Sequence, residues 1–188
     1  MSVVPFGEAQ TVNTTQHIPH VKPKYVWPVV KAMDEWDTFQ DLFSVVLVDD
    51  NDKNKHVIAT AATNNNYKGD KDDNESGPIV EVGQQIEIAS DFPLIPQVTL
   101  EEYDEIIEEE RICWTLRGFV LGDVTIPSPP CILRTARCIE LFKDGDDGTI
   151  IHNWISYEGL GWPVVVATTG KITENLFSDF NQELANQF

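Results

Sequence analysis

The sequence predicts an α+β protein made of an opening strand, one or two short helices, about six or seven antiparallel strands and one long C-terminal helix. Two patterns carry this prediction: a series of short β-branched runs separated by polar turns, and a final segment with apolar residues at helical spacing. The length agrees, because 188 residues with 41% hydrophobic side chains suffice for one sizeable core. We therefore expect one domain over residues 1–188.

The N-terminal part reads as a strand, short helices and a hairpin. The segment from Glu8 to about His20 has no helical periodicity and is expected to be extended. From Pro23 to Asp41, apolar residues recur at spacings of three and four, which predicts one or two short helices. The β-branched runs 43–48 and 56–63 are expected to form a hairpin, and the polar segment 64–78 a mobile loop.

The remaining strands and the closing helix follow from composition and spacing. Asp144–Gly148 is a strong hairpin turn between the last two expected strands. In the segment Pro163–Gln187, four apolar residues recur at spacings of four, as on the buried face of an amphipathic helix. The five strands are expected at 79–89, 97–103, 111–119, 132–142 and 149–157.

The charge excludes several classes of partner. Thirteen Lys and Arg against 31 Asp and Glu give a formal charge of −18, which repels phosphate backbones and anionic lipid, so no nucleic-acid partner is expected. Seven acids lie between Glu101 and Glu110, and we interpret them as a solvated turn or strand face. The apolar run Trp162–Ala167 is too short for a membrane span, so we expect no stable membrane insertion and a cytoplasmic location.

Cysteine and histidine spacing offers no metal or cofactor site. Cys113, Cys131 and Cys138 are odd in number and lack CxxC spacing, which argues against a disulfide framework or structural zinc and favours a reducing compartment. His17 and His20 have no acid near them in sequence to complete a metal site. Nucleotide-binding, serine hydrolase and zinc peptidase motifs are missing from the sequence, so we expect no cofactor.

Several short motifs occur along the chain in a defined order and spacing. They are Val26-Trp27, Trp36, Gly83, Ile112-Cys113-Trp114, Glu140-Leu141, Gly148-Thr149, Tyr157-Glu158-Gly159-Leu160 and the segment from Phe177 to Leu184. Together they resemble the SRPBCC superfamily, which includes START, Bet v 1 and polyketide cyclase proteins. The resemblance implies the helix-grip fold, in which a curved sheet wraps around the last helix and encloses a deep apolar cavity. Members are lipid and hormone carriers, aromatase/cyclases and co-chaperones.

The strand register implied by this resemblance provides candidate site residues. It points Arg137 and Tyr157 into the cavity and His152 to the other face, although a slip of one residue would reverse this. A buried Arg137 either pairs with an acid or receives an anionic or enolate oxygen of a ligand; an outward salt bridge to the acids near Glu101 is the alternative. Tyr157 is a candidate proton donor, or a core aromatic with a satisfied hydroxyl.

Asp123 and a set of lining residues complete the candidates. Asp123 precedes the rigid segment 127–130, which we expect to form a lip over the cavity, and is a candidate general base or an ordinary turn acid. The expected ligand-binding residues are aromatic, apolar or amide side chains, with core packing as the alternative for the two tryptophans. They are Trp36, Trp114, Leu116, Ile139, Asn153, Ile155, Leu176 and Phe180.

The resemblance leaves three functions open. The first is a cofactor-independent cyclase, dehydratase or isomerase acting on a small hydrophobic, polyketide-like or aromatic molecule. The second is a carrier of a lipid, sterol or secondary metabolite, whose cavity wall would be almost uniformly apolar. The third is a co-chaperone-like interaction module that docks a basic partner on the acidic segment. The expected partner is a small hydrophobic molecule, and the protein is expected to be a monomer or homodimer.

Overall fold

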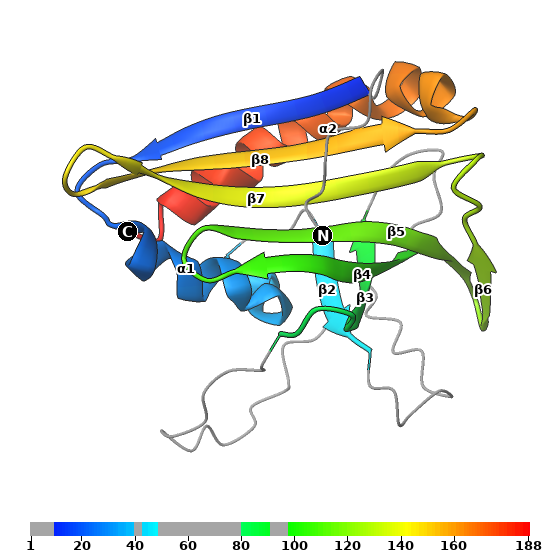
Figure 1. Ribbon diagram of the computed structural model, residues 1–188, viewed down its shortest axis with the longest axis horizontal. Coiled ribbons are helices and arrows are strands. Elements are labelled where there is room, and N and C mark those ends of the chain that lie inside the picture. The colour runs from blue at the N-terminus through cyan, green and yellow to red at the C-terminus, as the bar shows by residue number, and fades with distance from the viewer. Residues whose placement is uncertain (1–9, 40–42, 49–79, 91–97) are drawn as a thin grey trace.

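The computed structural model describes residues 10–39, 43–48, 80–90 and 98–188 (Figure 1). These residues form one antiparallel sheet in the order β1-β8-β7-β5-β4-β3-β2, with β6 paired to β5. The predicted α+β architecture is confirmed. The elements are β1 (Gln10–Ile18), α1 (Pro23–Lys31), the 3-10 helix η1 (Met33–Thr38), β2 (Phe43–Leu47), β3 (Gln85–Ser90), β4 (Val98–Ile107), β5 (Arg111–Leu121), β6 (Val124–Pro127), β7 (Arg134–Asp144), β8 (Gly148–Glu158) and α2 (Trp162–Ala185).

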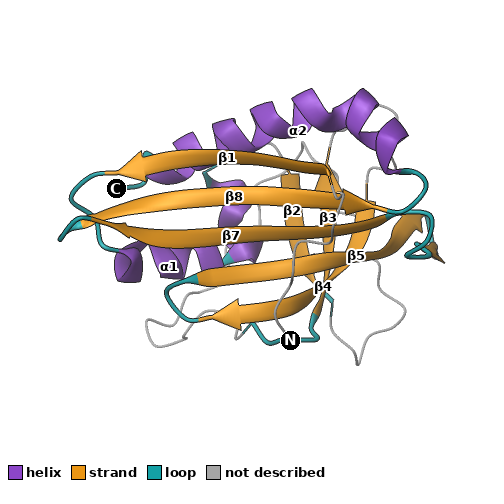
Figure 2. Cartoon of the chain, turned by 45° about the horizontal axis from the view of Figure 1, so that its top comes forward, coloured by secondary structure: helices purple, strands orange, loops and turns teal. Residues whose placement is uncertain are grey.

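The long helix α2 lies along one face of the sheet, over β1 and β8 (Figure 2). We call this the inner face and the opposite one the outer face. Pro163 occupies the first turn of α2, where its missing N–H costs no hydrogen bond. The buried side of α2 changes character along its length, from Thr169 and Thr173 to Phe177, Phe180 and Leu184. None of the helices in the described part of the chain combines the length and apolarity that a membrane crossing requires.

The apolar end of α2 closes against an aromatic cluster. The ring of Trp36 on η1 lies 4.7 Å from that of Phe180 and 6.4 Å from that of Trp114 on β5. Tyr103 on β4 meets Trp114 edge-on and donates its hydroxyl to Met33 Sδ at 2.8 Å. All five side chains are fully buried. Burial of each is worth about 1.5–3 kcal/mol, so this cluster fixes η1, α2 and the centre of the sheet relative to one another.

The hairpin of β4 and β5 contains two bulges, with one extra residue on each strand. Arg117 lies between the pairs Leu100–Gly118 and Glu101–Leu116, and Asp104 lies between the pairs Tyr103–Trp114 and Glu105–Cys113. The two extra residues meet on the outer face, where Arg117 Nη2 lies 3.1 Å from Asp104 Oδ1. Because each bulge absorbs one residue, Glu101 and Tyr103 stay on the inner face while Glu105 is carried to the outer one.

A disulfide joins Cys113 and Cys138, and the prediction from cysteine spacing is therefore wrong. The two residues are register partners on β5 and β7, with their Cα atoms 4.1 Å apart. They are 25 residues apart in the chain, so only the strand pairing brings them together, and a count of cysteines could not show it. Cys131 is free and exposed. The cysteines consequently give no support to a reducing compartment.

Several element boundaries also differ from expectation. The strand expected from residue 79 starts only at Gln85, because Gly83, at φ 90°, turns the chain and donates its N–H to the Tyr103 carbonyl at 2.8 Å. β4 continues to Ile107 through the acidic segment, and β6 was not expected at all. The strand expected at 56–63 and the loop expected at 64–78 lie outside the described residues.

Candidate acid-base and ligand site

Four neighbouring strands bring a cluster of polar side chains to the inner face. In the register, Arg137 of β7 is opposite Trp114 of β5 on one side and Ile155 of β8 on the other. On β8, Tyr157 is the next residue after Ile155 whose side chain points to the inner face. On β4, Glu101 is the inward-pointing residue that precedes Tyr103. This polar cluster therefore lies beside the aromatic cluster, at the threonine-bearing end of α2.

Arg137 is held between two aromatic rings. Its guanidinium carbon lies 4.5 Å from the centre of the Phe177 ring on α2 and 5.1 Å from that of Trp114. Only 8% of the residue is exposed. Burial lowers the pKa of the guanidinium to about 10, while Glu101 and Tyr157 act in the opposite direction. The group stays positively charged at neutral pH, so the inner face carries a buried cation.

Glu101 provides the negative charge that faces this cation. Its carboxyl accepts a hydrogen bond from Thr99 Oγ1 at 2.9 Å. Burial raises the pKa of the carboxyl, and Arg137, then Thr99 and the Trp114 indole N–H oppose that rise. Trp114 Nε1 makes no hydrogen bond of good geometry in the described residues. A carboxyl whose pKa is raised in this way is a stronger base, once ionised, than an ordinary glutamate.

Tyr157 is the third titratable group of the cluster. Its hydroxyl lies 3.4 Å from Thr173 Oγ1 on α2. Burial raises the pKa of the phenol; hydrogen bonding to Thr173 and the charge of Arg137 lower it, whereas Glu101 raises it. The phenol therefore remains protonated at neutral pH and can act as a hydrogen-bond donor.

Asn153 belongs to a second polar chain on the inner face. Its Nδ2 donates to Asn181 Oδ1 at 3.4 Å, and Asn181 Nδ2 donates to Thr14 Oγ1 at 2.9 Å, so that this chain joins β8, α2 and β1. Asn153 is fully buried, and its Oδ1 has no hydrogen-bond partner among the described residues. A buried acceptor without a partner is costly, which makes it a candidate contact for a donor on a ligand or water.

The predicted site residues are divided by the structure into three groups. Trp36, Ile139 and Phe180 are fully buried in the core, where neighbouring side chains already cover them. Ile155 and Leu176 keep partly exposed side chains, and Leu116 is the register partner of Glu101. Trp114, Asn153, Arg137 and Tyr157 lie in or beside the polar clusters described above.

Asp123 is not part of this arrangement. It lies in the exposed turn between β5 and β6. No contact joins it to Arg137 or Tyr157 among the described residues, so the candidate base has to be sought elsewhere. The segment expected as a lip is partly the strand β6, which is exposed along its length.

Glu101 is the functional candidate that the sequence did not single out. It is the first of seven acids, and composition alone could not separate it from the other six. The signal in the sequence was that Thr99, Glu101 and Tyr103 occupy every second position. In a strand, this spacing places the three side chains on one face. The interpretation of the whole segment as a solvated face is wrong for Glu101, because the carboxyl faces Arg137 on the inner side.

The other acids of the segment are mostly held in ion pairs. Glu102 and Asp104 bind Arg117, at 3.0 and 3.1 Å. Glu105 lies 3.1 Å from Arg111, and Glu108 lies 3.4 Å from Lys31. These pairs neutralise much of the negative charge that the interaction-module hypothesis assigned to a basic partner.

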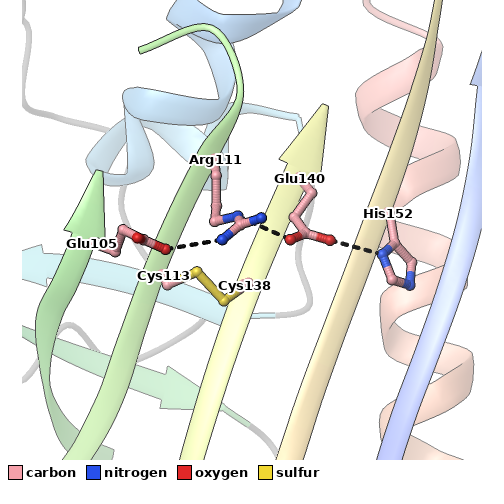
Figure 3. A network of polar contacts seen from close by, with 6 residues as sticks. All are labelled: Glu105, Arg111, Cys113, Cys138, Glu140 and His152. Carbon is pink, nitrogen blue, oxygen red and sulfur yellow. Dashed lines mark hydrogen bonds and ion pairs between the residues drawn. A yellow bond between two sulfur atoms is a disulfide. The ribbon is translucent and has the colours of Figure 1, made fainter. Parts of the chain in front are cut away.

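A row of alternating acidic and basic side chains crosses the outer face next to the disulfide (Figure 3). Arg111 Nε lies 2.9 Å from Glu140 Oε1, and Glu140 Oε2 lies 3.0 Å from His152 Nδ1. With Glu105, this outer row joins β4, β5, β7 and β8. The expectation that His152 faces away from the cavity agrees with this position.

One open pocket lies apart from both clusters. It measures about 630 Å³ and lies between the start of α1, the turn after β4 and the end of β7. Its charged lining is balanced, with four basic and four acidic side chains, and two of these, Arg111 and Glu140, already bind each other. The pocket therefore offers less chemistry than the inner-face cluster.

Comparisons with known proteins show the fold. No family model matches the sequence, and no curated protein matches it. A hypothetical protein of Helicobacter pylori is similar over 100% of this chain and 96% of its own, with a TM-score of 0.64 and 11% identity. A norcoclaurine synthase point mutant of Thalictrum flavum, solved in complex with a transition-state analogue, covers 95% of both chains with a TM-score of 0.57 and 12% identity.

Ara h 8.0201 is a third similar structure, with a TM-score of 0.53, 13% identity and coverage of 95% of this chain and 99% of its own. The chain therefore has a Bet v 1-like fold. At these identities the similarity defines the architecture, and the chemistry has to be argued from the residues of this chain.

Proposed function

We propose that the protein binds a small, largely apolar, aromatic or polyketide-like molecule between the sheet and α2, and converts it by cofactor-independent cyclisation, dehydration or isomerisation. The observation that carries this proposal is the convergence of Glu101, Arg137 and Tyr157 on one part of the inner face. A carrier needs an apolar wall, whereas an enzyme needs at least two convergent groups that donate or accept protons. The synthase among the similar structures supports the view that this architecture can hold a reacting ligand.

The three groups are suited to different steps of such a reaction. The Glu101 carboxylate removes a proton from a carbon next to a carbonyl group, and the electron pair of the broken C–H bond moves to the carbonyl oxygen. The Arg137 cation stabilises the enolate oxygen as its charge develops. The enolate carbon then bonds to a second carbonyl carbon of the same molecule, and the new alkoxide takes a proton from Tyr157 or from protonated Glu101.

The product of that sequence is an isomer of the substrate. Subsequent loss of the hydroxyl group, together with a proton from the neighbouring carbon, forms a C=C double bond and gives a product lighter by one water. Neither step requires an oxidant or a cofactor. Binding adds a further contribution, because a folded substrate presents its two reacting carbons to each other.

Native mass spectrometry tests the proposal directly. The purified protein is extracted with organic solvent to identify any bound molecule, and is then incubated with a panel of polyketides and sterols. A substrate converted to an isomer or a dehydrated product supports the enzyme. A molecule that is bound and recovered unchanged, with no conversion across the panel, supports the carrier instead and contradicts the proposal.

Two arginine variants then locate the chemistry. Arg137→Met keeps a long apolar side chain between the two rings but removes the cation, and we expect the rate of conversion to fall about 10²–10³-fold. Arg111→Met is the matched control, because this arginine lies in the outer row. Equal rates in wild type and Arg137→Met would exclude a catalytic role for the polar cluster.

A further inference from the structure

We propose that β1 is a dimer interface, on which β1 of a second copy of this chain pairs in antiparallel fashion about a two-fold axis at Thr14. The sheet then continues from one copy into the other. The inference goes beyond the proposed function, because it concerns the edge of the sheet and requires no ligand.

The first step of the argument is that β1 has an open side. β1 is the first strand of the sheet and forms one of its edges (Figure 1). All nine of its residues pair with β8, without a bulge. Among the described residues, β8 is the one strand that pairs with β1. An edge of this kind presents a row of N–H and C=O groups to another strand.

The second step identifies the backbone groups on that open side from the register. The N–H of Leu141 on β7 donates to the carbonyl of Glu110, just before β5, at 2.7 Å. Backbone groups alternate between the two sides of a strand, so the even-numbered residues of β7 bond to β8. By the same alternation, the odd-numbered residues of β8 bond to β1, and Asn153 bonds to its register partner Thr14.

The odd-numbered residues of β1 therefore direct their N–H and C=O groups away from β8. These residues are Thr11, Asn13, Thr15 and His17, and all four are exposed. The contact of the Gln16 side chain agrees with this assignment, because its Nε2 donates to the His17 carbonyl at 3.1 Å.

The third step is that β1 lacks the features by which edge strands avoid pairing with other chains. Asp, Glu, Lys and Arg make up 23% of the sequence, but none of the nine residues of β1 is of these four types. The strand also contains no proline and is rich in threonine, which favours strands. Two copies with a net charge of −18 repel each other, so an uncharged segment is where they can approach most closely.

The fourth step is that the strand is complementary to itself. A two-fold axis at Thr14 pairs Thr11 with His17 of the partner subunit, and Asn13 with Thr15 of the partner subunit. All four residues have their backbone groups on the open side, so each pair exchanges two hydrogen bonds. The side chains that meet are polar and bring no like charges together.

Sedimentation equilibrium and hydrogen exchange test the pairing in the wild-type protein. We expect a species of twice the 21.2 kDa chain mass at about 50 μM, and a larger dimer fraction in about 0.5 M than in about 0.05 M sodium chloride, because salt screens the repulsion. The amides of Asn13 and Thr15 should exchange at least about tenfold more slowly in concentrated than in dilute protein. The Thr14 amide, which bonds to β8, should be slow in both.

Charged variants test the register. The double variants Asn13→Lys with Thr15→Lys, and Asn13→Glu with Thr15→Glu, each place like charges opposite each other across the axis, so each should be monomeric alone. A mixture of the two should form a heterodimer, because every introduced lysine then faces a glutamate. Thr125→Lys is the matched control, because it adds a charge to the exposed strand β6, and it should leave the dimer unchanged.

Each contrary result overturns a defined part of the inference. A wild-type mass of one chain up to about 200 μM at both salt concentrations excludes the dimer. A dimer whose Asn13 and Thr15 amides exchange as fast as in dilute protein has its interface elsewhere. A dimer in either double variant alone, or no heterodimer in a mixture of the folded variants, contradicts the pairing about Thr14. Conversion of a ligand on the inner face is measured separately and stands or falls independently.

Discussion

Two arginines on neighbouring strands are held in opposite ways. Arg137 of β7 faces α2 and is enclosed by the rings of Trp114 and Phe177, whereas Arg111 of β5 faces outward and binds two carboxylates at 2.9 and 3.1 Å. Carboxylates satisfy the guanidinium and fix its direction, so Arg111 joins strands and has little further chemistry to offer. The two aromatic rings beside Arg137 attract its charge through their faces, so the two arginines are held by different kinds of interaction.

Charged side chains therefore have different roles on the two faces of this sheet. The outer row contributes to stability through contacts that are already made. The inner cluster contains a buried cation, a carboxyl of raised pKa and a neutral phenol, a combination that is typical of functional sites. Stability and binding should therefore respond to mutations on opposite faces.

The largest effect on stability is expected from the disulfide beside the outer row. Replacement of both Cys113 and Cys138 by alanine opens a loop of 25 residues, and we expect the free energy of unfolding to fall by about 3 kcal/mol. Urea denaturation of the folded variants measures this loss, and the rate at which the protein converts its substrate should be unchanged. A loss of conversion in the folded variant would show that the two faces are coupled, and would break the comparison.

A smaller loss is expected from the outer row itself. Arg111→Met removes the bridge between Glu105 and Glu140 and should lower the free energy of unfolding by about 1–2 kcal/mol, because the side chains are only partly exposed. Arg137→Met should cost less, since Glu101 can become protonated when its cation is lost. Urea unfolding of the two variants at the same pH gives the order. The reverse order would assign the structural role to Arg137.

The dependence of stability on pH reports on Glu101. Its pKa in the folded protein is raised by burial, so over the pH range between its unfolded and folded pKa values the folded state holds a proton that the unfolded chain has released. Stability therefore falls as the pH rises through that range, by at most about 1.4 kcal/mol per pH unit, and levels off above the folded pKa.

Glu101→Gln should remove this component of the pH dependence, and Glu102→Gln should keep it. Urea titrations between about pH 4 and pH 8 provide the measurement. If the free energy of unfolding depends on pH in the same way in wild type and in Glu101→Gln, the Glu101 carboxyl is solvated. That result would weaken the contrast between a buried inner cluster and an ion-paired outer row.

The smallest effect is expected on the exposed side of α2. Lys171 and Glu174 form an ion pair at 3.0 Å in which both side chains are well exposed. Lys171→Ala should change the free energy of unfolding by only about 0.3 kcal/mol. Thermal unfolding of Lys171→Ala and Arg111→Met under the same conditions compares the loss of stability from an exposed ion pair with the loss from the outer row. A loss as large as that of Arg111→Met would mean that the row behaves like any surface pair.

The sequence predicted the order of elements well, because that order depends on local patterns. Apolar spacing predicted α2 within two residues at each end, because a single sequence displays the period of a helix. The inward positions of Asn153, Tyr157 and Arg137 came from the strand register that the family resemblance implies. The contacts of these three residues with α2 agree with that register.

The features that escaped prediction depend on pairing between distant segments. The disulfide exists because two strands are in one register, and the role of Glu101 depends on a cation 36 positions later in the chain. Strict alternation from Glu101 would have placed Glu105 inside and Ile106 outside. The bulge at Asp104 reverses both, and bulges leave no local signal in an acidic run.

Those two bulges bear on how the chain can change in length over evolution. If Asp104 and Arg117 were deleted together, the remaining residues of β4 and β5 could pair in a regular ladder with Glu101 still opposite Leu116 and Tyr103 still opposite Trp114. The inserted residues project away from α2 and bind each other, so the hairpin can lengthen or shorten there without exchanging the residues that line the interior. Insertions and deletions at this place are separated from the site, and the same two positions are suitable for attaching a probe without entering it.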